Sequence, residues 1–132
     1  MRGANMQLIP FVSVDGLLFT SLREDIERQW GRPVEEGFNL VGLTELDYGW
    51  VVFRFQSSGR LEEITTQADE IAVDGHAVSF GALEAFVCRH DAAVFRRAGF
   101  VVSPRFGLAF DPTSDRWVTV LAAHCLDEWR KL

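Results

Sequence analysis

The sequence of 132 residues lacks any long hydrophobic run, and no stretch approaches the roughly 20 apolar residues that a membrane-spanning helix needs. The segment that follows Met1 also lacks the apolar region of a secretory signal. We therefore expect a cytoplasmic protein, in which thiols stay reduced. The sequence has only two cysteines, Cys88 and Cys125, and we interpret both as small buried hydrophobic residues, with a disulfide as the open alternative.

Motifs for catalysis and for phosphate binding are also absent. The glycines of the first half are too dispersed for a phosphate-binding loop, and no serine has the glycine-flanked strand-to-helix context of a hydrolase nucleophile. A triad of His90-Asp91 with Ser79 or Ser103 lacks that context, and we interpret His90 as a core histidine. The sequence thus predicts no enzymatic activity.

The spacing of cysteine and histidine does not match a zinc site. One residue separates Cys88 from His90, and His124 is adjacent to Cys125, whereas paired zinc ligands typically have about two to four residues between them. Adjacent residues on a strand also point to opposite faces of the sheet. We therefore expect neither a bound metal nor a cofactor.

Basic residues are scarce in one segment. Residues 35–74 include nine acidic and two basic side chains, and the whole chain has a net charge of −6. Such a surface repels nucleic acid and anionic membranes, and it attracts a basic protein partner. The open alternative is a solvated acidic face that only keeps the protein soluble.

Aromatic residues occur inside this acidic segment. Tyr48 and Trp50 are set among carboxylates, as is typical of protein-binding surfaces, although packing of Trp50 in the sheet core is an open alternative. We expect the neighbouring carboxylates to be exposed and to anchor Arg or Lys side chains of the partner. The predicted partner-binding residues are Glu35, Glu36, Glu45, Asp47, Tyr48, Trp50, Glu62 and Glu63.

Hydrophobic periodicity predicts a single α+β domain over residues 1–132, with one antiparallel sheet and helices on one of its faces. Ser21-Leu22-Arg23-Glu24 predicts a capping box at a helix start, and Gly31 predicts its end. A second helix is expected from about Phe80 to His90, and residues 126–132 form a short helix or a frayed tail. Strands are expected at 8–14, 46–55, 60–66, 71–73, 77–79, 100–102, 106–110 and 117–122, with a loop or irregular strand at 35–42.

The sequence also predicts two degenerate repeats. Val14-Asp15-Gly16 returns as Val73-Asp74-Gly75, and Tyr48-Gly49 is echoed by Phe106-Gly107. Each copy has the same order of apolar strand, turn, helix and then strands joined by tight turns. The first repeat extends over about 8–67 and the second over about 70–122.

The residues that define this unit in the first copy are Gly16, Ser21-Leu22-Arg23-Glu24, Ile26, Trp30-Gly31-Arg32-Pro33 and Tyr48 to Ile64. This pattern resembles the repeat of the β-lactamase inhibitory protein-like fold. The second copy departs from it, because Gly-x-Pro is lost after His90. Small acidic bacterial proteins of this kind are also similar to immunity proteins of contact-delivered or type VI-secreted toxins. The resemblance implies inhibition by occlusion of a partner's active site.

We therefore expect a non-enzymatic protein-binding module, namely an immunity or inhibitor protein that blocks a basic partner such as a secreted toxin. The alternative is a small-molecule-binding or hydrolytic α+β domain with a pocket between helix and sheet. A cavity with polar groups around His90 would favour that alternative, and a filled core would favour the binding module. The oligomeric state is left open.

Overall fold

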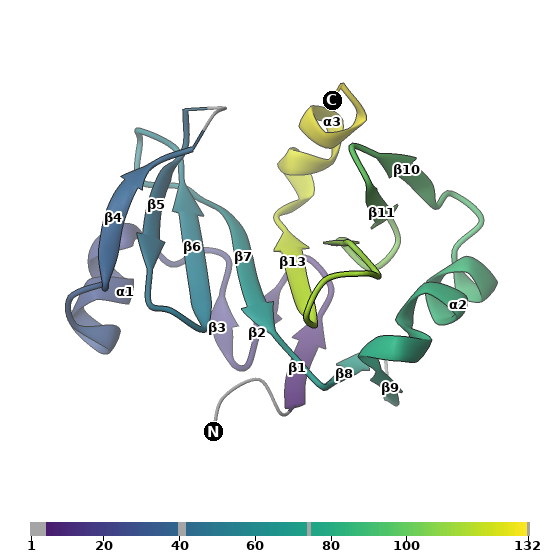
Figure 1. Ribbon diagram of the computed structural model, residues 1–132. Coiled ribbons are helices and arrows are strands. Elements are labelled where there is room, and N and C mark those ends of the chain that lie inside the picture. Colours follow the sequence, from purple (N-terminus) through teal and green to yellow (C-terminus); the bar gives the residue numbers. More distant parts are fainter. Residues whose placement is uncertain (1–4, 40–41, 74, 132) are drawn as a thin grey trace.

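The computed structural model describes residues 5–39, 42–73 and 75–131 and has an α+β fold with two β-sheets (Figure 1). The smaller sheet has the order β3-β2-β1-β8-β9, in which β1 and β8 are parallel and the other pairs are antiparallel. Its strands are β1 (Asn5–Ile9), β2 (Ser13–Val14), β3 (Leu17–Leu18), β8 (Glu70–Val73) and β9 (His76–Ser79).

The larger sheet is antiparallel throughout and has the order β10-β11-β12-β13-β7-β6-β5-β4. Its strands are β4 (Glu35–Phe38), β5 (Thr44–Asp47), β6 (Val51–Phe55), β7 (Leu61–Gln67), β10 (Phe95–Arg97), β11 (Phe100–Ser103), β12 (Leu108–Phe110) and β13 (Trp117–Leu121). The central pair, β7 and β13, joins the four strands of each half of the chain.

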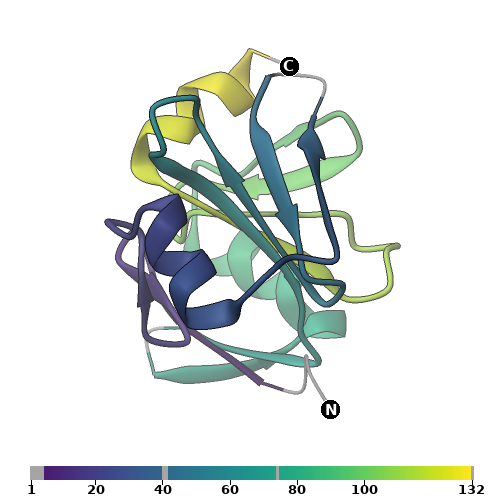
Figure 2. The ribbon, with the colours of Figure 1, turned by 90° about the vertical axis from the view of Figure 1, so that its left-hand side faces the viewer.

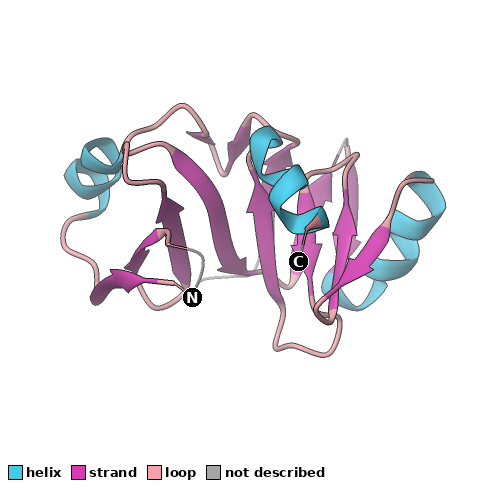
Figure 3. Ribbon diagram, turned by 90° about the horizontal axis from the view of Figure 1, so that it is seen from above, coloured by secondary structure: helices cyan, strands magenta, loops and turns pink. Residues whose placement is uncertain are grey.

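Within the described ranges, three α-helices and one short 3₁₀ helix accompany the sheets, namely α1 (Arg23–Trp30), α2 (Phe80–His90), η1 (Ala123–Cys125) and α3 (Leu126–Arg130). Figure 3 shows α1 and α2 at opposite ends of the molecule, with α3 between them. In Figure 2, α1 lies between the N-terminal strands and the blue strands β4 to β6. The helix expected from Phe80 to His90 is confirmed, and the short C-terminal helix is formed.

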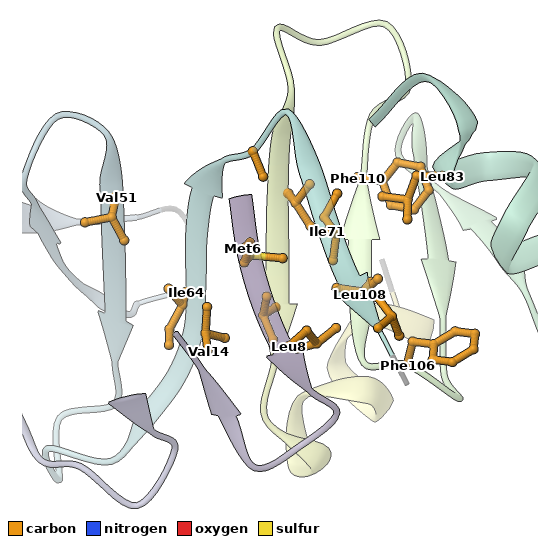
Figure 4. Close-up of a cluster of buried hydrophobic side chains, with 14 of the residues drawn as sticks. Met6, Leu8, Val14, Val51, Ile64, Ile71, Leu83, Phe106, Leu108 and Phe110 are labelled. Atoms are coloured by element: carbon orange, nitrogen blue, oxygen red, sulfur yellow. The ribbon is translucent and has the colours of Figure 1, made fainter. Parts of the chain in front are cut away.

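The main hydrophobic core lies on one face of the larger sheet, which we call the inner face. Val51, Phe53 and Phe55 are buried there, whereas Val52 and Arg54 of the same strand are more exposed, as the alternation predicts. The core also includes residues of β1, β8 and α2, some of which are drawn in Figure 4. Both sheets and the two longer helices therefore share one apolar interior.

The first helix begins one residue later than the sequence indicates. Leu22, not Ser21, is the N-cap, and its N–H donates a 2.9 Å hydrogen bond to the carboxylate of Asp25. The predicted stop is confirmed, because Gly31 ends the helix with a φ of 79°. That backbone conformation is accessible to glycine at little cost.

Two of the predicted strands are each broken by a turn. The expected strand at 46–55 is wrong, because β5 and β6 form a hairpin around Gly49, whose φ is 92°. The N–H of Gly49 donates to the Asp47 carboxylate at 2.7 Å, which stabilises the turn. The expected strand at 8–14 likewise divides into β1 and β2, with Phe11 at a φ of 64°.

The arrangement of one sheet with helices on one face is also wrong. A second sheet packs on the inner face together with α1 and α2, while η1 and α3 contribute to a separate cluster on the opposite, outer face. That cluster contains Val102, Ala109 and Leu121, apolar residues of the large sheet that point away from the main core. The C-terminal segment covers them, and this removes their apolar surface from water.

The order of elements recurs along the chain. Strands of the smaller sheet, one helix and four strands of the larger sheet occur up to Gln67, and the same series occurs from Glu70 to Leu121. An origin by duplication stays a prediction. The repeated turn at Asp74-Gly75 includes Asp74, which lies outside the described residues. No helix in the described part of the chain is long and apolar enough to cross a membrane.

Candidate functional site

The outer face of the larger sheet carries a groove of about 580 Å³. One side is formed by the first-half strands and their loops, and the other by η1, α3 and β11. Residues lining it are Asn39, Leu43, Glu45, Arg54, Gln56, Glu62, Glu63, Phe100, Thr119, Cys125, Glu128 and Trp129. Four of these residues are glutamates and one is an arginine, so the groove has an excess of acidic side chains.

A row of charged residues crosses the floor of the groove. Glu45, Arg54 and Glu63 are neighbours in register on β5, β6 and β7, so their side chains lie on the same face. Arg54 Nε donates to Glu45 at 2.6 Å, and Arg54 Nη1 lies 3.4 Å from the Glu63 carboxylate. The row therefore places one guanidinium between two carboxylates.

The hydroxyl groups of two threonines extend this network across the centre of the sheet. Arg54 Nη1 donates to Thr65 Oγ1 at 2.6 Å, and Thr65 Oγ1 lies 2.8 Å from Thr119 Oγ1. Thr65 and Thr119 are register partners on β7 and β13. The polar floor thus continues from the first half of the chain into the second.

The aromatic wall of the groove comes from the second half. Trp129 on α3 packs edge-on against Phe100, with ring centroids 5.3 Å apart. The Trp129 indole N–H donates to the Glu63 carboxylate at 2.9 Å. Burial raises the pKa of Glu63, and the charge of Arg54 together with this indole hydrogen bond opposes the rise. Glu63 is therefore a partly desolvated carboxylate that is held by two donors.

Glu62 occupies a β-bulge. Arg54 pairs with Glu63 and Phe55 pairs with Leu61, so Glu62 has no residue opposite it on β6. A bulge redirects the extra side chain, and the Glu62 side chain is only 4% exposed. Its Oε2 atom contacts His124 Nε2 and lies 3.7 Å from Arg60 Nε.

Cys125 lies beside Glu62. Its thiol donates to the main-chain carbonyl of Glu62 at 3.2 Å. Burial and the nearby carboxylates of Glu62 and Glu63 raise the pKa of this thiol. Both cysteines are free, and Cys125 is buried as expected, but Cys88 is exposed, so its expected burial is wrong.

The predicted partner-binding carboxylates do not form one surface. Glu45 and Glu63 lie in the groove, and the exposure expected for Glu62 is wrong because that side chain is buried. Glu35 on β4 and Asp47 on β5 are register partners at the edge of the outer face. The other predicted carboxylate, that of Glu36, is in register with the buried Leu46 and forms a 2.7 Å ion pair with Arg23 of α1.

The two predicted aromatic anchors pack against the main core. The ring of Trp50 packs at a tilt against Trp30 of α1, with ring centroids 4.9 Å apart, and Tyr48 contacts Trp30 and Phe53. The Tyr48 hydroxyl donates to the Gly31 carbonyl at 2.9 Å. The core role that was open for Trp50 therefore holds for both residues, since both are partly buried against the core.

The residues around His90 do not form a triad. His90 is exposed, so its expected burial is wrong, and its ring lies on Phe86 with centroids 4.6 Å apart. Ser103 instead donates directly to the buried Asp91 carboxylate at 2.7 Å, and the Arg105 N–H donates to the same oxygen at 3.0 Å. Asp91 thereby fastens the end of α2 to the loop after β11, which is a structural role.

Arg54, Trp129 and Thr119 are central to the groove but were not among the predicted site residues. The sequence pattern could have identified Arg54, because it is a charged residue at an outward-facing position of an otherwise apolar strand. No sequence pattern could have identified Trp129, since the sequence of a short terminal helix does not indicate where the helix packs.

Searches against family models, curated proteins and solved structures find no match for this chain. The groove and the residues around it are therefore the basis for a functional assignment.

Proposed function

We propose that this chain is a non-enzymatic protein-binding module, an immunity or inhibitor protein that takes a basic segment of its partner into the outer-face groove. The observation that carries the proposal is the composition of the groove, in which four glutamates and one arginine lie beside an aromatic wall. The charge of Arg54 is already paired with Glu45 and Glu63, so a cationic side chain of the partner would meet an unbalanced acidic surface.

The wall supplies the apolar part of such a contact. Trp129 and Phe100 are partly buried and remain accessible from the groove, and large aromatic residues are common anchors in protein interfaces. We assign them the anchoring role that the sequence suggested for Tyr48 and Trp50. Glu35 and Asp47 extend the acidic surface toward the edge strand β4. The proposed partner is a basic protein such as a secreted toxin, met in the cytoplasm.

The likeness to tandem-repeat inhibitors stays part of this proposal. It is supported by the recurrence of small-sheet strands, one helix and four large-sheet strands in both halves. In this view the halves are degenerate repeats that have diverged on the outer face, and the first half provides most of the charge.

A matched pair of charge reversals on α3 tests the groove. Glu128 lines it, whereas the adjacent Asp127 does not, and their side chains are 75% and 80% exposed. We expect Glu128→Arg to weaken binding of a basic partner by about tenfold or more at low salt, since it places a like charge against the ligand. Asp127→Arg makes the same charge change outside the groove, and we expect less than about a twofold effect.

The measurement is calorimetry on a partner identified by cross-linked capture from the source cells, at two ionic strengths. Circular dichroism confirms that both variants fold. Equal affinities for the two variants would overturn the assignment of the groove, even if the captured protein binds tightly.

A small cationic molecule is the second candidate ligand. The groove volume of about 580 Å³ lies within the range typical of ligand pockets, and Arg54, Glu63 and Thr119 converge on its floor. A saturable rise in Tm with spermidine that Glu128→Arg abolishes and Asp127→Arg retains would favour this candidate over the protein partner.

A further inference from the structure

Three metal-ligating side chains converge where the bulge on β7 meets η1. One ligand atom from each of Glu62, His124 and Cys125 lies within 4.8 Å of the other two. In the part of the chain that the structure describes, this is the only group of three or more such side chains. Cys88 and His90, which the sequence also offered as ligands, are not part of it.

The local backbone explains why two adjacent residues reach the same point. On a strand, His124 and Cys125 would point to opposite faces of the sheet. His124 and Cys125 instead belong to the 3₁₀ helix η1, in which successive side chains are only about 120° apart around the axis. Both can therefore approach Glu62, which the bulge turns toward η1.

The carboxylate of Glu62 gives a second, independent indication that a cation binds here. Its Oε2 atom is fully buried and makes no hydrogen bond to any described residue. His124 Nε2 and, at 3.7 Å, Arg60 Nε form ion-pair contacts with this atom, and neither contact is a hydrogen bond. A buried carboxylate oxygen without a hydrogen bond is costly, and a cation bound between the oxygen and the imidazole would remove that cost.

The donor set selects the kind of cation. Mg²⁺ and Ca²⁺ prefer oxygen ligands, whereas the combination of a thiolate sulfur, an imidazole nitrogen and a carboxylate oxygen suits Zn²⁺. Three protein ligands leave one position of a tetrahedron free. Because Glu62 and Cys125 both line the groove, the free position would face it.

We propose that Glu62, His124 and Cys125 bind one Zn²⁺ ion at the end of the outer-face groove, with the fourth position open to the groove. Binding releases the thiol proton of Cys125 to solvent as the sulfur–zinc bond forms. The ion cross-links η1 to β7, segments about sixty positions apart in the sequence, and places positive charge beside Glu63. This proposal does not depend on the identity of any protein partner.

The test is a titration of the metal-stripped protein with CoCl₂ and, by calorimetry, with ZnCl₂. We expect one ion per chain, the visible absorption of tetrahedral Co²⁺, a thiolate-to-cobalt charge-transfer band in the near ultraviolet, and loss of both on addition of Zn²⁺. A higher Tm in the presence of Zn²⁺ is expected as well, because a ligand that binds only the folded state stabilises it.

Variants separate this site from adventitious binding. Cys125→Ser should remove the charge-transfer band, and His124→Ala, a change at a partly exposed position, should weaken Zn²⁺ binding at least tenfold without unfolding the protein. Cys88→Ser changes the exposed cysteine and should leave both signals intact. Absence of stoichiometric binding, or a charge-transfer band that follows Cys88 instead of Cys125, would overturn the proposal.

Discussion

The two halves of the larger sheet have similar inner faces and different outer faces. Strands β4 to β7 carry a charged row on the outside, with Glu45, Arg54 and Glu63 in register. Strands β11 to β13 carry mainly apolar residues there, including Val102, Ala109 and Leu121, which are fully buried. On the inner face both halves contribute buried aromatic and aliphatic side chains to one core.

This difference allows one part of the outer face to contribute apolar burial while the other part lines a groove. The apolar outer half needs a cover, and η1 and α3 provide it. The polar outer half has no such cover over β5 and β6, where Arg54 forms ion pairs with Glu45 and Glu63. The groove lies between the covered and uncovered halves, with Trp129 of the cover reaching across to Glu63.

The largest expected effect compares outer-face residues of the two central strands. Leu121→Ala on β13 removes a fully buried side chain and should lower the free energy of unfolding by about 2–5 kcal/mol. Thr65→Ala on β7 removes the hydroxyl that bonds Arg54 and Thr119, at a cost of about 1 kcal/mol. Urea unfolding measures both. Similar costs would mean that the two halves do not differ as described.

The next effect concerns the charged row. Arg54→Met leaves the partly buried carboxylates of Glu45 and Glu63 without the guanidinium that they share. We expect a loss of about 1–3 kcal/mol in unfolding free energy, which is below the cost of breaking a fully buried pair because solvent reaches these groups. Adding Glu63→Gln should recover part of the loss.

The control for this prediction lies in the second half. Arg96→Met breaks a pair with Glu84 whose side chains are 61% and 40% exposed, and it should leave the urea midpoint almost unchanged. If Arg54→Met also leaves the urea midpoint almost unchanged, the charged row does not stabilise the groove floor.

The smallest effect concerns the ends of the two longer helices, since α1 ends at a glycine and α2 at the buried Asp91. Burial by itself raises the pKa of Asp91, but hydrogen bonds from the Arg105 N–H, the Ser103 hydroxyl and the Ala93 N–H outweigh it and lower the pKa below 3.8. A lowered pKa in the folded state gives stability that is present above the ordinary pKa and lost as pH falls through the lowered one.

Asp91→Asn should therefore lower the free energy of unfolding by about 1 kcal/mol at neutral pH. The difference in unfolding free energy from the unmodified protein should shrink as pH falls below 3.8. Urea unfolding between neutral pH and pH 3 measures it. A deficit that stays constant over this range would show that the charge of Asp91 does not contribute, and that only its shape matters.

Much of the secondary structure could be predicted because it depends on local patterns. The buried phase of β6, with Phe53 and Phe55 inside, follows from strict alternation. The end of α1 at Gly31 follows from the backbone freedom of glycine. The α+β class follows from the mixture of these two periodicities.

The site was harder to predict because it depends on register and docking. Glu62 looked like an exposed strand residue, but a one-residue bulge buries it beside η1. The sequence predicted Tyr48 as a surface anchor and left Trp50 open between surface and core, but the hairpin at Gly49 brings both to Trp30. Neither the bulge nor the packing of α1 has a signature within a few residues of the affected side chain.

By itself, the sequence determined the inner core and the excess of negative charge in the first half, since alternation and composition are properties of the chain alone. Only the tertiary structure decided which side chains each carboxylate contacts. Pairing of β5, β6 and β7 sets Glu45 and Glu63 on either side of Arg54, and docking of the C-terminal segment brings His124 and Cys125 to Glu62. The physical reason is that strand register and helix docking are set by burial of apolar surface across distant segments, which no local pattern encodes.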